Sequence, residues 1–137
     1  NNGATGTVTW VKNAVAGDTY HAGGFSTSTA VESSSYTNLA PVISLVNGSA
    51  ELAGGNLMSV LNNSISIDLA NKFHASTNYS LKLTVSPKTG LLKGTFKNPE
   101  NGNAVTKIGG VVLQNANTGR GNFPGVNQYG SFELHSN

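Results

Sequence analysis

Residues that could perform acid–base or nucleophilic chemistry are scarce in this chain. It has six Asp and Glu residues, three His and no Cys. Hydrolysis of a glycosidic bond needs two carboxylates beside one bond, but the six acidic residues are isolated from one another in the sequence. No G-x-S-x-G motif marks a nucleophilic serine. The sequence therefore predicts a protein that is not an enzyme. The alternative is a small hydrolase or metal-dependent oxidase, which would need the fold to bring two acids or two histidines together.

The same residues give little sign of a metal centre. His21, His74 and His135 are far apart and lack the spacing of metal-binding motifs. The absence of Cys excludes disulfides, zinc–thiolate sites and iron–sulfur clusters. We expect no cofactor, with one alternative left open. A structural calcium ion could be held by scattered carboxylates and backbone carbonyls without a motif, and Asp18 and Asp68 are the two aspartates that could contribute.

Aromatic residues in loop-like segments are the best candidates for a binding site. A sugar offers apolar C–H faces that stack on an aromatic ring and hydroxyl groups that bond to polar side chains, which is the usual pattern of a ligand site. Tyr20, Tyr36 and Tyr129 lie in such segments, where function is often located. Polar residues close to Tyr129 are predicted to act with the tyrosines: Arg120, Asn127 and Gln128. The alternative is that each ring only packs at the rim of the core.

Three other aromatic residues are assigned to the hydrophobic core. Trp10 lies two residues after Val8 in a segment that alternates with threonine. Tyr79 alternates in the same way with Leu81, and Phe96 follows a similar pattern. Because residues two apart in a strand share a face, we expect all three rings to be buried with their apolar neighbours.

Two-residue alternation is the dominant pattern in the sequence, and it is clearest in residues 62–69 and 79–86. Each such segment would bury one face and expose the other. Further strands are expected at residues 7–10, 24–31, 42–46, 49–52, 91–97, 104–113 and 130–135. The dipeptide Asn47-Gly48 predicts a tight hairpin over residues 42–52. Residues 56–61 form the one helical turn that we expect.

These elements predict an all-β fold, an antiparallel sandwich or barrel of about 8–10 strands. We expect residues 1–137 to form a single β domain. The chain contains two similar successions of short motifs, which begin at Thr5-Gly6 and Thr89-Gly90. Each consists of a Thr-Gly pair, then a Lys-Asn pair and then a Gly pair. Residues 5–61 and 79–135 are therefore expected to be related half-sheets that share one core.

The composition indicates a surface that is polar without many ions. Only 10% of residues are charged, whereas Ser, Thr, Asn and Gly together make up 63 of 137. The formal charge of +2 and the four prolines do not fit a disordered chain, and no apolar run is long enough to span a membrane. This composition favours a secreted or cell-surface bacterial protein. Because Asn1-Asn2-Gly3-Ala4 lacks the features of a signal peptide, we interpret the chain as mature or as part of a longer polypeptide.

Basic residues are concentrated in the second half of the chain. Residues 1–70 contain one Lys and four acids, whereas residues 71–137 contain seven basic and two acidic residues. Four of these lysines could contact an acidic polysaccharide: Lys82, Lys93, Lys97 and Lys107. The alternative is a solvated lysine row that discourages strand edges from pairing. Eight basic residues are too sparse for a nucleic-acid interface, so no nucleic-acid partner is expected.

The C-terminal half carries a recognisable pattern. It reads T-G-L-L-K-G-T-F-K-N-P from Thr89, G-G-V-V-L-Q from Gly109, G-R-G-N-F-P-G from Gly119 and Q-Y-G-S from Gln128. This resembles an uncharacterised C-terminal β module that recurs in large secreted bacterial proteins with β repeats. The resemblance covers residues 79–135 well and residues 5–61 loosely. It implies an extracellular module attached to a longer polypeptide, and it implies no catalytic residue.

Together these observations predict a non-catalytic carbohydrate-binding module of a secreted or cell-surface bacterial protein. A polysaccharide would be held by exposed aromatic and amide side chains. The alternative is a structural or assembly module of a bacterial surface protein or filament that binds no small ligand. In that case exposed strand edges would pair with neighbouring molecules.

Overall fold

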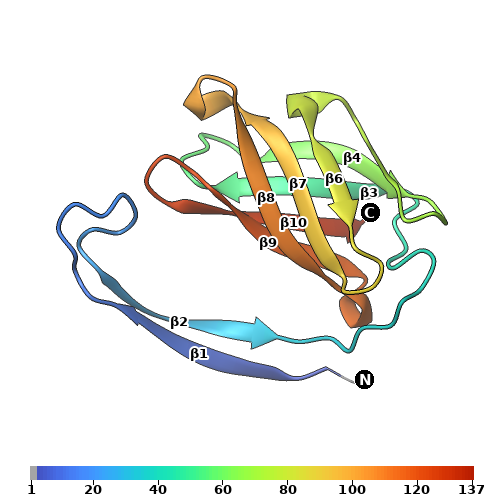
Figure 1. Ribbon diagram of the computed structural model, residues 1–137, viewed down its shortest axis with the longest axis horizontal. Helices are drawn as coiled ribbons and strands as arrows, with labels where there is room; N and C mark the ends of the chain where they lie inside the picture. The colour runs from blue at the N-terminus through green and yellow to red at the C-terminus, as the bar shows by residue number, and fades with distance from the viewer. Residues whose placement is uncertain (1–2) are drawn as a thin grey trace.

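The computed structural model describes residues 3–137, so Asn1 and Asn2 of the polar N-terminal stretch lie outside it. Within that range the chain is all-β, as its alternating pattern predicts, and it forms ten strands and three short 3-10 turns (Figure 1). The strands are β1 (Thr5–Lys12), β2 (Phe25–Glu32), β3 (Gly48–Gly54), β4 (Leu61–Ile67), β5 (Phe73–Ala75), β6 (Lys82–Val85), β7 (Leu91–Asn98), β8 (Ala104–Leu113), β9 (Thr118–Pro124) and β10 (Tyr129–Ser136). The 3-10 turns are η1 (Asn78–Ser80), η2 (Pro99–Asn101) and η3 (Gln114–Ala116).

Strands β3 to β10 form one antiparallel sheet in the order β5-β4-β3-β10-β9-β8-β7-β6. Strands that are consecutive in the sequence pair with each other, except β5 and β6, which lie at the two ends of the sheet. The first and last strands of the series, β3 and β10, also pair with each other. A single backbone bridge between Lys72 and Thr84 joins the two remaining ends of the sheet. The result is a nearly closed eight-stranded up-and-down barrel, with β6 to β9 crossing in front of β3 and β4 in Figure 1.

The interior of this barrel is filled by side chains. Phe96, Phe123 and Phe132 are each at most 1% exposed, and the rings of Phe96 and Phe123 meet edge to face with centroids 5.0 Å apart. The prediction that Phe96 is buried is confirmed. A barrel of eight strands is only wide enough for its own side chains, so this packed interior leaves the outer surface for a ligand. Gly130 belongs to the same packing, because a Cβ atom there would collide with the ring of Phe123.

Residues 42–46 do not form the expected strand, and the hairpin predicted over 42–52 is wrong. Asn47-Gly48 instead leads directly into β3. Most of the apolar side chains in the segment still join the core: Val42, Ile43 and Leu45 are at most 4% exposed. The backbone of this segment bonds mainly to amide side chains: Asn117 Oδ1 and Nδ2 pair with Ser44 N and O at 2.7 and 2.8 Å. Among residues 3–137, one backbone bond joins the segment to a strand, from Ile67 N of β4 to Leu45 O at 3.0 Å.

Other local predictions also differ from the structure. The helical turn expected at residues 56–61 is absent, since the chain turns there and then enters β4. Strands β5 and β9 are not among the predicted strands. Strand β5 has only three residues, too few to show alternation, and glycine and proline interrupt the apolar pattern of β9. Tyr79 is not in the core: it lies in η1 with φ of 53° and is 38% exposed, because this turn breaks the alternation before β6 begins.

Strands β1 and β2 form a separate two-stranded arm that runs along one side of the barrel (Figure 1). Residues 5–61 are thus divided between this arm and the barrel, whereas residues 79–135 supply β6 to β10. The assignment of Trp10 to the core is wrong, since its side chain is 62% exposed. Alternation does place Trp10 and Val8 on one face of the arm, but no layer formed by residues 3–137 covers that face. No helix among residues 3–137 has the length and hydrophobicity to cross a membrane.

Candidate functional site

Two of the three candidate tyrosines come together at the tip of the arm. Tyr20 lies in the loop between β1 and β2, and Tyr129 is the first residue of β10. Their ring centroids are 4.9 Å apart with an angle of 35° between the planes. The Tyr20 hydroxyl donates a hydrogen bond to the carbonyl oxygen of Gly125 at 3.0 Å. The loop is anchored by this contact, and Tyr129 remains 55% exposed, so the pair presents an aromatic surface to solvent.

The β9–β10 loop that carries Gln128 and precedes Tyr129 is held in place by Asn56. The Oδ1 atom of Asn56 accepts hydrogen bonds from the backbone N–H groups of Val126 and Asn127 at 2.9 and 3.2 Å. Its Nδ2 atom donates to Asn127 Oδ1 at 2.8 Å. Gln128 is exposed beside Tyr129. Sequence reasoning missed Asn56, which is 71 residues away from Asn127 and lies in the segment expected to be helical.

A groove on the outer face of β6 to β9 adjoins this loop. Its volume is about 710 Å³. The residues that line it include Lys82, Lys93, Lys107, Thr84, Thr95, Gly109, Asn122 and Pro124. A second hollow of about 340 Å³ shares Lys107 and Pro124 with the groove and is lined on its other side by Tyr20 and Gly125. The groove is therefore continuous with the base of the tyrosine pair.

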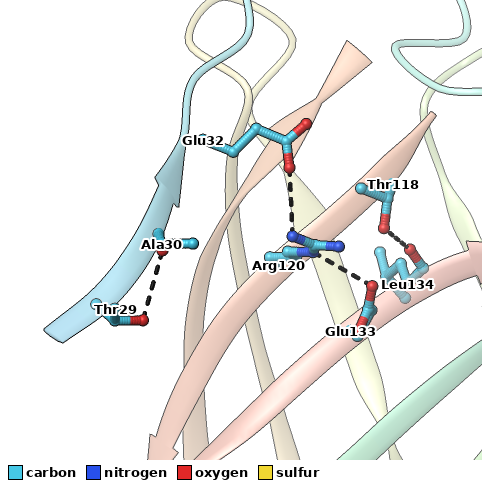
Figure 2. Close-up of polar contacts among 7 residues, drawn as sticks. All are labelled: Thr29, Ala30, Glu32, Thr118, Arg120, Glu133 and Leu134. Carbon is cyan, nitrogen blue, oxygen red and sulfur yellow. Dashed lines mark hydrogen bonds and ion pairs between the residues drawn. The ribbon is translucent and has the colours of Figure 1, made fainter. Parts of the chain in front are cut away.

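Arg120 lies outside this region, in an ion-pair cluster that joins the arm to the barrel (Figure 2). Its Nη1 atom is 3.3 Å from Glu32 Oε2 on β2, and its Nε atom is 3.2 Å from Glu133 Oε1 on β10. Arg120 is four residues along β9 from Pro124, which pairs with Tyr129. At the rise of a strand this is about 13 Å. The structure therefore does not bring Arg120 to the tyrosine pair, and both of its contacts are structural.

Tyr36 lies on another part of the surface and packs against the core. Its ring covers Gly90, where a Cβ atom would come within 2.6 Å of the tyrosine Cε2 atom. Its hydroxyl donates to the carbonyl oxygen of Pro87 at 2.8 Å. Burial raises the pKa of Tyr36, although a hydrogen bond with the backbone of Gly90 acts in the opposite direction. The ring and hydroxyl of Tyr36 are thus used in packing, and only Tyr20, Tyr129, Asn127 and Gln128 form one cluster.

The fold brings some carboxylates together. Glu32 and Glu133 share Arg120 as an ion-pair partner. Glu51 on β3 and Glu133 on β10 are direct cross-strand partners on the outside of the barrel. Each also faces a basic side chain, with His135 Nε2 3.8 Å from Glu51 and Arg120 beside Glu133. Both carboxylates are more than 40% exposed and neither lines the groove. Sequence reasoning missed this pair, because 82 residues separate its members.

The aspartates are engaged in local contacts. Asp18 Oδ2 accepts a hydrogen bond from Lys12 Nζ at 2.8 Å. Asp68 is 2.9 Å from His74 Nε2 and also accepts bonds from the backbone N–H groups of Ala70 and Lys72. The hydrogen bond with His74 is the main reason that the pKa of Asp68 is lowered. Among residues 3–137, no three His, Asp or Glu side chains are grouped so that they could hold a metal ion.

Family models, curated protein sequences and solved structures give no match to the chain. Two surface features could bind a ligand: the tilted tyrosine pair on an anchored loop and the basic groove that runs to its base.

Proposed function

We propose that this protein is a non-catalytic carbohydrate-binding module, and that it holds a polysaccharide on the outside of its barrel. The observation that carries the proposal is the Tyr20–Tyr129 pair, which exposes an aromatic face next to an open groove. An aromatic face suits the C–H surface of a pyranose ring, and amide and hydroxyl groups suit its rim. Gln128, Asn122 and Thr95 supply such groups nearby.

The anchoring of the loop supports this proposal. A binding surface on a mobile loop loses affinity because the loop must be ordered when the ligand binds. Here Asn56 bonds to the backbone of the β9–β10 loop, and the Tyr20 hydroxyl bonds to Gly125 within it. The tyrosine rings are consequently held in place before any ligand arrives. We propose further, from composition and the resemblance above, that the module belongs to a longer secreted or cell-surface bacterial protein.

Affinity electrophoresis against a panel of soluble polysaccharides, with pull-down on insoluble ones, tests this function. We expect at least one polysaccharide to retain the protein, and Tyr129→Ala to lower its affinity at least about tenfold because a central aromatic contact is lost. Tyr79→Ala is the matched control, since it removes another exposed tyrosine outside the site. Absence of retention by every polysaccharide, or equal losses in the two variants, would refute the proposal.

A second candidate function is assembly into a surface structure through the β1–β2 arm. A two-stranded hairpin is at best marginally stable without a covering layer, and this arm exposes large apolar side chains: Val8, Trp10, Val11 and Val31. A second copy of the chain could cover them. Sedimentation over a wide concentration range tests this idea. Oligomers that are lost in Trp10→Ser would favour it, and a monomer at every concentration would count against it.

A further inference from the structure

The outer face of the barrel gathers lysines from strands that are distant in the sequence. Lys82 on β6 and Lys107 on β8 both pair with Thr95 of β7, one from each side. They are therefore two strand spacings apart, or about 10 Å between backbones. Lys93 is two residues from Thr95 on β7, diagonal to Lys107 at about 7–8 Å. All three line the groove. Lys72 extends this face, because it pairs with Thr84 across the closing bridge.

No acidic residue among those described lines this groove. Within residues 3–137, the ion pairs engage Lys12, His74, Arg120 and His135, and none engages Lys82, Lys93 or Lys107. The three ammonium groups therefore share an open groove in which no side chain of residues 3–137 neutralises them. Such an arrangement attracts an anion and repels other cations.

Protection of a sheet edge does not explain these lysines. An edge strand gains from a lysine because the charge discourages pairing with another chain. Lys82 lies on β6, which has only the bridge at Thr84 on its open side. Lys93 and Lys107 lie on β7 and β8, and both of these strands are paired on both sides. Two of the three lysines are thus in positions where no edge needs protection.

The shape of the groove depends on Gly109, which lies on β8 between Lys93 of β7 and Asn122 of β9 in the register. A Cβ atom at Gly109 would meet nothing within 4 Å, and its φ is not in the left-handed region. The backbone therefore does not require glycine here. Its effect is to leave the floor of the groove open between charged and amide side chains.

We propose, building on the carbohydrate-binding function above, that this groove binds a polysaccharide that carries carboxylate or sulfate groups. Lys82, Lys93 and Lys107 pair with anionic groups of successive sugar units. The chain then continues past Lys107 and Pro124 to the Tyr20–Tyr129 pair, where a ring stacks. Lysines separated by about 7–10 Å suit a polymer with repeated charges better than a single small anion.

The test compares matched charged and neutral polymers with the full chain: dextran sulfate against dextran, and polygalacturonate against its methyl ester. We expect the charged member of at least one pair to bind more tightly, and its affinity to fall as NaCl rises from about 0.01 M to about 1 M. The pair that shows the difference identifies sulfate or carboxylate as the group bound. Equal binding of charged and neutral members in both pairs overturns the inference.

Single variants of equal net charge locate the site. Lys93→Gln and Lys107→Gln are each expected to weaken binding of the charged polymer about 1.5- to 5-fold, the range for exposed charge pairs. Lys88→Gln, in the turn before β7, removes the same charge outside the groove and should leave binding unchanged. Losses as large in Lys88→Gln as in Lys93→Gln would show general attraction to the protein and would overturn the proposal.

Gly109→Val fills the groove without changing charge. We expect it to weaken binding of the charged polymer while the melting temperature is retained, because the added side chain enters open space on a strand. Unchanged binding by this variant contradicts the groove as the site. Single-stranded DNA that binds as tightly and depends on the same lysines would contradict the choice of a glycan.

The outcomes separate this inference from the function on which it rests. If the protein binds neutral polysaccharides, loses them in Tyr129→Ala and binds charged ones no better, the anionic groove is wrong and the carbohydrate-binding function stands. If it binds neither charged nor neutral polymers, both proposals fail.

Discussion

Amide side chains act in this protein as partners for backbone groups that no strand satisfies. Gln114 is the clearest case: its Nε2 atom donates to the carbonyl oxygens of Thr37 and Val42 at 2.8 and 2.9 Å, and its Oε1 atom accepts from Thr37 N at 2.7 Å. Asn117 binds Ser44 in a similar two-sided way. Each such hydrogen bond contributes a net stabilisation of about 0.5–1.5 kcal/mol, and less where the bonded groups are exposed to water. Part of the high Asn content is therefore structural.

Gln114→Ala should lower the free energy of unfolding by about 1–3 kcal/mol, because it removes three hydrogen bonds to the segment before β3. Urea denaturation measures the change. Gln128→Ala is the matched control, since Gln128 is exposed in the β9–β10 loop, and its effect should be within about 0.5 kcal/mol. Equal stability of the two variants would mean that the segment does not depend on this amide.

The hydrogen bonds of Asp68 should make the free energy of unfolding depend on pH, in a direction that they determine. The pKa of Asp68 is lowered in the folded protein, chiefly by His74. The carboxylate therefore stabilises the fold above the unfolded pKa of about 3.9, and this contribution is lost as pH falls through the folded pKa. Asp68→Asn should be less stable than the wild type at pH 7, and the difference should shrink below about pH 4. A difference that stays constant with pH in urea titrations would contradict this.

At the scale of elements, the β1–β2 arm is the part of the fold that packing explains least. It touches the barrel near its two ends, through Tyr20 at the tip and the Glu32–Arg120 ion pair at the base. Between them its side chains are largely exposed on both faces. The arm therefore depends on its two attachments and on the cross-strand pairs of β1 and β2.

Trp10 makes this exposure measurable, because it is the only tryptophan of the chain. Its fluorescence in the folded monomer should have the long emission wavelength of a hydrated indole, and acrylamide should quench it readily, since the side chain is 62% exposed. Self-association through the arm should shift the emission to shorter wavelength as concentration rises. Emission typical of a buried indole in the dilute monomer would place the arm elsewhere than the structure does.

At the scale of the whole molecule, barrel closure directs binding to the outside. Phe96, Phe123 and Phe132 help to fill the interior, and the groove and the tyrosine pair lie next to each other on the outer surface. A ligand that uses both must be long enough to extend from Lys93 to Tyr129. The site is thus an extended surface and not an enclosed pocket.

This arrangement predicts a dependence on ligand length. An oligosaccharide that reaches both regions should bind more tightly than a short one, because its second contact is made at high effective concentration. Tyr129→Ala should weaken the long ligand and leave a short ligand in the groove nearly unchanged. A length series measured by calorimetry tests this. Affinity that does not vary with length would mean that the two regions do not act together.

Strand periodicity was enough to predict part of this architecture. Residues 62–69, 91–97, 104–113 and 130–135 alternate because one face of each is buried, and each overlaps a strand of the barrel. Phe96 was assigned correctly for the same reason. Trp10 shows the limit of the argument, since alternation identifies the side chains that share a face but not whether another layer covers that face.

The candidate site was predicted only in part, for a related reason. Tyr129, Asn127 and Gln128 are neighbours in the sequence, so a common loop was foreseeable. The contacts of Tyr20 with Tyr129 and of Asn56 with Asn127 join residues 109 and 71 positions apart. Proximity in the sequence groups Arg120 with this loop. In the structure Arg120 lies four residues along the extended strand β9, where it pairs with Glu32.

The sequence by itself determined the all-β class, the absence of cysteine chemistry and the polar, weakly charged surface, since these depend on composition and on periodicity along the chain. Only the tertiary structure decided that β3 pairs with β10, that the arm lies outside the barrel, and that lysines of β6, β7 and β8 share one groove. Those contacts depend on which strands become neighbours in space, and strand pairing is set by the packing of the whole core and not by local pattern.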